Sequence, residues 1–208
     1  MNNPRVTENA LVGGNAQVSG NAQVFEDARV DGDAWVSGNA RVGGDALVSG
    51  NAQVSGDALV SGNAQVYGNA QVYGNALVGE CAQVYGDARV SGRAWVDECA
   101  QVYGDARVFG NARVSGDAQV SGDARVYGYA QISGDARVGG NAWVSGNAWV
   151  GGEAEINSDK DWRLIAPDLT VYRSRCAERY EIRNGEGELV SLETLSEVQL
   201  AEFFDWFI

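Results

Sequence analysis

The side chains that most often do chemistry in proteins are scarce in this sequence. Its 208 residues include no histidine and three cysteines, and the formal net charge is -13. Histidine is the commonest general base and the commonest neutral metal ligand, so its absence removes both roles. A carboxylate base or a cysteine nucleophile is the remaining route to catalysis. We therefore predict no catalytic, cofactor-binding or metal-binding residues.

A six-residue repeat accounts for most of the chain. Val or Ile occupies every sixth position from Val6 to Ile156, and Ala stands two residues earlier from Ala10 to Ala154. The unit is A-x-V-x-G-(N/D). Ala and Val face one side of an extended segment and the x residues face the other. Gly followed by Asn or Asp turns the chain. Strands this short must stack on copies of themselves.

An eighteen-residue period lies above the six-residue one. Similar segments begin at Glu80 and Glu98, and Glu replaces the turn Gly only at Glu8, Glu26, Glu80 and Glu98. Three hexads therefore make one coil of a three-sided parallel β-helix. We predict an all-β fold of about eight coils over residues 1–158, roughly 40 Å long, followed by a small α+β cap over residues 159–208.

The uninterrupted hexads resemble the hexapeptide-repeat left-handed parallel β-helix superfamily across residues 5–157. This resemblance implies the left-handed sense. The family includes trimeric acyltransferases and γ-class carbonic anhydrases, which depend on histidine, and catalytically silent proteins from bacteria and phages. Because this sequence has no histidine and no interrupted hexad, it is most similar to the silent type.

Outward residues eighteen apart should form columns on the three faces. Leu59, Leu77 and Trp95 would form an apolar strip, which we interpret as a candidate interface. Tyr67, Tyr85 and Tyr103 would stack beside glutamines, for structural or binding reasons. A third column holds Arg89, Arg107 and Arg125 near Tyr73, Phe109 and Tyr127. Asp87, Asp105 and Asp123 at the adjoining corner could offset the repulsion between these arginines, and we interpret the column as a solvated charge ladder.

One corner of the coil is predicted to be an acidic ridge. It comprises Glu26, Asp27, Asp45, Glu80, Glu98, Asp117 and Asp135. This ridge either keeps a repetitive β-protein soluble or mimics the phosphates of DNA. Cys81 and Cys99 should be neighbours in adjacent coils, within disulfide range. A reducing cytosol favours two free thiols.

The residues after the repeat predict a lid on the last coil. Short strands are expected at Trp162–Ile165, Thr170–Ser174, Tyr180–Arg183 and Glu188–Val190, with a turn at Asn184–Gly185. A helix should begin at Ser191 or Thr194, where Thr194 and Glu197 form a capping box. Trp143 and Trp149 are expected to receive this cap. Its last apolar residues add further candidate interface positions: Phe203, Phe204, Trp206 and Phe207.

Together these features favour a cytoplasmic, non-enzymatic scaffold that binds protein. The start lacks a signal peptide and no apolar run is long enough to span a bilayer. The expected partner is a host protein or a second copy, without direct contact to nucleic acid or membrane. A bare first coil predicts self-association. The resemblance adds a phage or prophage origin. The alternatives are an acidic DNA mimic, an acyltransferase-like enzyme and a passive spacer.

Overall fold

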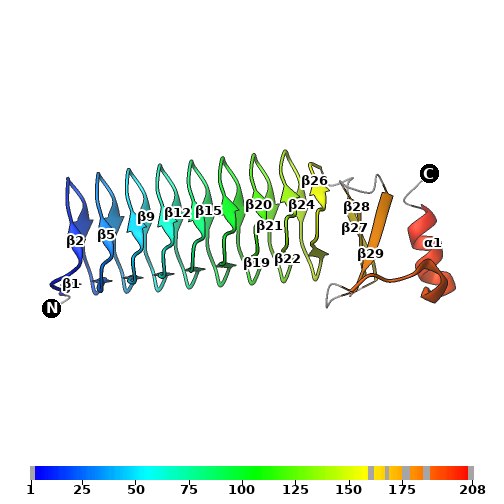
Figure 1. The fold of residues 1–208 in the computed structure, drawn as a ribbon, viewed down its shortest axis with the longest axis horizontal. Helices are drawn as coiled ribbons and strands as arrows, with labels where there is room; N and C mark the ends of the chain where they lie inside the picture. The colour runs from blue at the N-terminus through cyan, green and yellow to red at the C-terminus, as the bar shows by residue number, and fades with distance from the viewer. Residues whose placement is uncertain (1–2, 159–161, 167–168, 175–178, 185–187, 206–208) are drawn as a thin grey trace.

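The chain forms a rod of stacked coils with a smaller unit at its C-terminal end (Figure 1). The computed structural model describes residues 3–158, 162–166, 169–174, 179–184 and 188–205. The first of these ranges makes the rod, and the others belong to the cap.

The rod is built from two-residue strands in three parallel sheets. Each strand pairs with the strands three places before and after it in the chain. Sheet A contains β1 (Arg5–Val6), β4 (Gln23–Val24), β7 (Arg41–Val42), β10 (Leu59–Val60), β13 (Leu77–Val78), β16 (Trp95–Val96), β19 (Arg113–Val114), β22 (Gln131–Ile132) and β25 (Trp149–Val150). Sheet B contains β2 (Leu11–Val12), β5 (Arg29–Val30), β8 (Leu47–Val48), β11 (Gln65–Val66), β14 (Gln83–Val84), β17 (Gln101–Val102), β20 (Gln119–Val120), β23 (Arg137–Val138) and β26 (Glu155–Ile156). Sheet C contains β3 (Gln17–Val18), β6 (Trp35–Val36), β9 (Gln53–Val54), β12 (Gln71–Val72), β15 (Arg89–Val90), β18 (Arg107–Val108), β21 (Arg125–Val126) and β24 (Trp143–Val144).

The strand register confirms eighteen residues per coil. Leu59 pairs with Leu77, and Leu77 pairs with Trp95. On the other sheets Gln65 pairs with Gln83, and Arg89 pairs with Arg107. The predicted three-sided parallel β-helix of about eight coils is therefore confirmed. Residues that share a phase of the eighteen-residue period lie in columns along the rod.

The interior of the rod is filled by the Ala and Val side chains of the repeat. Every repeat Val from Val24 to Val150 is fully buried, apart from the position held by Ile132, which is 1% exposed. The first coil differs, because Val6 is 47% and Val12 39% exposed. The N-terminal end of this core is thus open, as the sequence predicts.

The corners need glycine because the backbone turns in the left-handed region where coils approach closely. Gly56 has a φ of 71°, and a Cβ there would lie 2.9 Å from the N and O atoms of Gly74 in the next coil. Three glutamates adopt the same conformation, Glu26, Glu80 and Glu98, with φ of 60°, 52° and 55°. An L-residue pays about 1 kcal/mol or more for this conformation.

The cap consists of an antiparallel sheet and a short helical segment. Strands β27 (Trp162–Ala166), β28 (Leu169–Ser174) and β29 (Arg179–Arg183) form the sheet in that order. A 3-10 turn, η1 (Leu192–Thr194), and a helix, α1 (Glu197–Asp205), follow. The strand predicted at Glu188–Val190 is reduced to a bridge between Leu189 and Arg183. In the predicted turn, Asn184 contacts Glu188, whereas Gly185 lies outside the described residues.

The predicted start of the helix was wrong. The Oγ of Ser196 accepts a hydrogen bond from the N–H of Gln199, and the N–H of Ser196 donates to the Gln199 side chain. The capping box is therefore Ser196 with Gln199, two residues later than expected. Ser191 starts the preceding 3-10 turn, where its Oγ accepts the N–H of Glu193.

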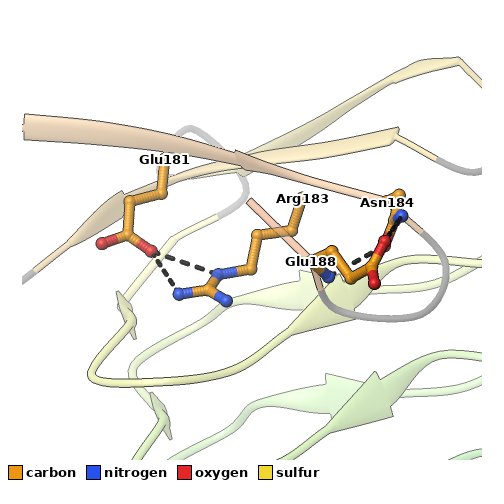
Figure 2. A network of polar contacts seen from close by, with 4 residues as sticks. All are labelled: Glu181, Arg183, Asn184 and Glu188. Carbon is orange, nitrogen blue, oxygen red and sulfur yellow. Dashed lines mark hydrogen bonds and ion pairs between the residues drawn. The ribbon is translucent and has the colours of Figure 1, made fainter. Parts of the chain in front are cut away.

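The cap is joined to the last coil through the two tryptophans that the sequence predicts. The Trp162 indole donates to the carbonyl of Trp143 (2.9 Å), and the N–H of Trp149 donates to the hydroxyl of Thr170 (2.8 Å). The Arg183 guanidinium lies over the Trp149 ring, 5.2 Å from its centroid. Figure 2 shows how Glu181 holds that guanidinium through two contacts with one carboxylate oxygen. These contacts fix the orientation of the cap on the rod.

Candidate interaction surfaces

The predicted apolar strip on sheet A exists, and its exposure is greatest at one end. Leu59 and Leu77 are half-buried, whereas Trp95 is 41% exposed. The Arg113 guanidinium lies 4.9 Å from the centroid of the Trp95 ring. Gly79 leaves room beside Leu77, since a Cβ there would approach the Leu77 side chain to 3.2 Å. The strip is thus a continuous column, and its most exposed part is Trp95 with the Arg113 guanidinium over the ring.

The candidate interface residues in the cap are placed differently from the strip. Phe203 is only 7% exposed and packs with Ile182 and Leu195 in a small core of the cap. Phe203 therefore stabilises the core of the cap. It is not the exposed contact residue that the sequence analysis predicts. Phe204 lies in α1, and Trp206 and Phe207 lie outside the described residues.

Sheet B carries a ladder of stacked tyrosines. The rings of Tyr67, Tyr85 and Tyr103 are parallel, with centroids 4.9 Å and 5.0 Å apart. Their hydroxyls contact the side-chain oxygens of Gln83, Gln101 and Gln119. Burial, together with the neighbouring Tyr67 and Tyr103, raises the pKa of Tyr85. Because the rings cover one another and their hydroxyls have partners, this tyrosine ladder has a structural explanation.

The acidic ridge lies at the corner between sheets A and B, and some of its carboxylates have structural partners. The Glu26 carboxylate accepts the N–H of Gly44, and the Glu98 carboxylate accepts the N–H of Gly116 in the next coil. These bonds offset part of the cost of the left-handed backbone at both glutamates. The ridge therefore contributes to coil stacking as well as to the charge of the rod.

The ridge also disfavours ionisation of its neighbours. Burial raises the pKa of Asp97, as do Glu98 and Glu80, against the opposing effects of Arg113 and a backbone hydrogen bond. The pKa of the Cys99 thiol is raised by desolvation, by its contact with Cys81, and by Asp117 and Glu80. Both cysteines are exposed free thiols in adjacent coils. The raised pKa of Cys99 lowers its thiolate fraction, so this thiol is poorly suited to nucleophilic chemistry.

A basic edge, which the sequence analysis did not recognise as one surface, lies between sheets C and A. Three consecutive coils contribute residues 89–95, 107–113 and 125–131, and these segments contain no carboxylate. We define the arginine edge by nine residues: Arg89, Arg93, Trp95, Arg107, Phe109, Arg113, Arg125, Tyr127 and Tyr129. The signal was present as these three acid-free segments, one coil apart.

Among the described residues, the arginine column of sheet C forms no ion pair with the aspartates of the adjoining corner. Arg89, Arg107 and Arg125 pair in register. Among the described residues, the salt bridge that forms joins Arg183 and Glu181 in the cap. Asp87 instead accepts a hydrogen bond from Asn69 (3.0 Å). Proximity in sequence between a corner aspartate and the arginine two residues later therefore did not produce an ion pair.

Comparison with protein families identifies the repeat. The model for the YdcK beta solenoid repeat matches six segments, each close to one coil in length: residues 52–68, 82–98, 100–116, 118–134, 130–146 and 136–152. These matches fall on the stacked coils seen in the structure. The chain is a β-solenoid repeat protein. No curated protein matches it at a significant level.

The matched repeats of the solenoid include the coils of the arginine edge, from residue 89 to residue 131. Within the described ranges, no cluster of three or more cysteine or acidic side chains is arranged to hold a metal ion. Among the same residues, no helix is long and apolar enough to cross a membrane.

Proposed function

We propose that this solenoid is a non-enzymatic scaffold that binds another protein on its outer surface. The observation that carries the proposal is the position of the exposed aromatic side chains. Trp35, Tyr73, Trp95, Tyr129 and Trp143 are 40–64% exposed, and all lie on sheets A and C or the corner between them. Tryptophan, tyrosine and arginine are the side chains most enriched in the central contacts of protein interfaces.

The filled interior supports the same proposal. Ala and Val occupy the core from coil to coil with almost no exposure, which leaves the outer faces to bind a partner. The chain has no histidine, and the Cys99 thiol has a raised pKa. Transfer of an acyl group or hydration of carbon dioxide would need a different base. Turnover of acyl-CoA or bicarbonate by the purified chain would overturn the non-enzymatic assignment.

Affinity capture of the full chain from cell lysate, with mass spectrometry of the retained proteins, tests the proposal. A scaffold that binds a partner should retain one protein in stoichiometric amount, and a Trp95→Ser/Trp143→Ser variant should retain much less. The matched control is Leu47→Ser/Gln65→Ser, which alters two outer side chains of sheet B away from the first coil. Retention of the chain alone would indicate a passive spacer.

Self-association is part of the proposal. The open first coil exposes Val6, Leu11 and Val12, of which Leu11 is 56% exposed. Apolar side chains and unpaired strand edges of this kind favour contact with a second copy. Light scattering across a range of concentrations should show an oligomer, and a Val6→Glu/Val12→Glu variant should shift it towards the monomer. A monomer at all concentrations would refute homo-oligomerisation.

A phage or prophage origin, with a host protein as the partner, completes the proposal and rests on the family resemblance. A cytoplasmic location is also part of the proposal and rests on the sequence features described above. The acidic ridge favours a second candidate function, mimicry of DNA. Carboxylates occupy this corner in successive coils at Glu80, Glu98, Asp117 and Asp135. A mimic should capture a DNA-binding enzyme in a salt-sensitive way, and neutralising these four residues should abolish capture.

A further inference from the structure

We propose that the arginine edge binds an extended acidic segment of a partner protein. This inference rests on the proposed function, because it gives the chemical class of the partner. The starting observation is that charge is segregated on the rod. Five of its nine arginines lie on the edge, which spans only three coils: Arg89, Arg93, Arg107, Arg113 and Arg125. The carboxylates are concentrated at the other two corners, so the edge is a local cationic site on an acidic molecule.

The guanidinium groups of the edge are available to a ligand. Arg89, Arg93, Arg107 and Arg113 are exposed and Arg125 is half-buried. None of the five has a carboxylate within 4.0 Å among the residues that the structure describes. Like charges stacked one coil apart repel one another, and no carboxylate among the described residues lies close enough to form an ion pair with them. A bound anion would therefore relieve an existing unfavourable interaction.

Two of these arginines are also held in fixed orientations. The Arg113 guanidinium lies 4.9 Å from the centroid of Trp95, and that of Arg125 lies 4.9 Å from the centroid of Trp143. A guanidinium stacked on a ring keeps its N–H groups free at its edge, where they match both oxygens of a carboxylate. The stacking reduces the conformational entropy lost on binding.

The surroundings favour a narrow acidic peptide over a nucleic acid. Asp87, Asp105 and Asp123 border the edge on one side, and Asp97 and Glu98 border it on the other. A nucleic acid wider than this strip would bring its phosphates close to these carboxylates. Base stacking also needs open aromatic faces. Phe109 and Tyr127 cover one another at 4.9 Å, and Arg113 lies over Trp95. Tyr129 is the most exposed ring of the edge, and one ring is not a platform for successive bases.

Fluorescence anisotropy with a labelled peptide of alternating Glu and Gly tests the inference on the full chain. The peptide should bind, the same peptide with Gln for Glu should not, and affinity should fall as salt is raised. An Arg89→Gln/Arg107→Gln/Arg125→Gln variant should bind at least about tenfold more weakly. The matched control, Arg5→Gln/Arg29→Gln/Arg137→Gln, makes the same change in net charge elsewhere and should bind within about twofold of the parent.

Three outcomes would overturn the inference: no binding of the Glu peptide, equal weakening in both triple variants, or tighter binding of oligo(dT) than of the peptide. If the triple variant does not fold, Arg107→Gln alone should weaken binding by about threefold. Failure here is distinguishable from failure of the proposed function. Capture of a partner that depends on Trp95 and Trp143 but not on the arginines would retain the scaffold and reject the acidic ligand.

Discussion

At the scale of single residues, the turn positions show what the repeat demands of the chain. Glycine is used wherever the backbone is left-handed, except at Glu26, Glu80 and Glu98. Glu26 and Glu98 each accept a glycine N–H of the next coil, and these bonds offset part of the conformational cost. A side chain without an acceptor group has no such compensation.

Gly56→Ala should therefore destabilise the rod by about 2 kcal/mol, because alanine meets the backbone of Gly74 in an unfavourable conformation. The matched control is Gly79→Ala, where the backbone is not left-handed and the added Cβ meets the flexible end of Leu77 at 3.2 Å and the Ser61 hydroxyl at an ordinary contact distance of 3.8 Å. Urea unfolding followed by circular dichroism measures both. Equal loss in the two variants would show that coil approach and backbone strain at Gly56 are unimportant.

The raised pKa of Asp97 makes the stability of the rod depend on pH. Its pKa is raised above the ordinary 3.8, so the folded protein binds this proton more tightly than the unfolded chain. Stability from this group therefore increases as pH falls through the raised pKa and decreases as pH rises through it. Asp97→Asn should be more stable than the parent at pH 7, and its stability should increase less than that of the parent as the pH is lowered from 7 to about 4, near the ordinary pKa of the unfolded chain.

The control for this prediction is Asp105→Asn, which removes an exposed aspartate from a different corner. Comparing the urea midpoints of the two variants at both pH values separates the local effect of Asp97 from the general effect of net charge. If the two variants show the same pH dependence, the cluster of Asp97, Glu80 and Glu98 is not the cause.

At the scale of elements, the outer columns contribute stability in proportion to how well they stack. Tyr85 has a parallel ring on each side, at 4.9 Å and 5.0 Å, whereas Tyr73 is 40% exposed between serines. Tyr85→Ser should cost about 1–2 kcal/mol more than Tyr73→Ser. Thermal unfolding of the two variants measures the difference, and equal melting temperatures would mean that the ladder has no stabilising role.

How much of each element was predictable depends on whether the repeat determines it. Periodicity determines the strand positions, the columns and the proximity of Cys81 to Cys99. The cap docks on the coil that carries Trp143 and Trp149, as predicted, but it contacts Trp143 through the backbone carbonyl and leaves the indole 49% exposed. The left-handed sense remains a prediction from family resemblance. The helix start was missed because Ser191, Thr194 and Ser196 all suit a cap, and tertiary packing chose between them.

The arginine edge was missed for a different reason. Columns were compared within a face, and the edge joins two faces across a corner. Arg93, Arg113 and Tyr129 each belong to a different column from Arg107. These residues are recognisable as one surface only when successive coils are compared and the segments without carboxylates are aligned.

At the scale of the whole molecule, one buried hydroxyl is among the groups that hold the cap on the rod. Thr170 is fully buried, and its Oγ accepts the N–H of Trp149. Thr170→Val leaves that N–H without its acceptor, at a cost of about 1–3 kcal/mol. The exposed Thr194→Val is the matched control. Amide hydrogen exchange at Trp149 should accelerate in the first variant alone, and unchanged exchange would show that the hydroxyl does not hold the cap.

The three sides of the rod have the same interior of Ala and Val, so they should be interchangeable as far as the core is concerned. Deleting residues 51–56 removes one hexad, keeps every Ala and Val facing inward and turns the first coils by one side relative to the rest. Only the outer contacts at one junction between coils change, and the stacked tyrosines are untouched. The free energy of unfolding should therefore fall by about 1 kcal/mol. Deleting residues 51–59 removes a hexad and a half and interrupts the inward pattern at one coil, which should lower the melting temperature far more. Circular dichroism during thermal unfolding compares the two deletions. If both lower the melting temperature by a similar large amount, the three sides are not equivalent. The outer columns, rather than the Ala and Val core, would then determine how the coils stack.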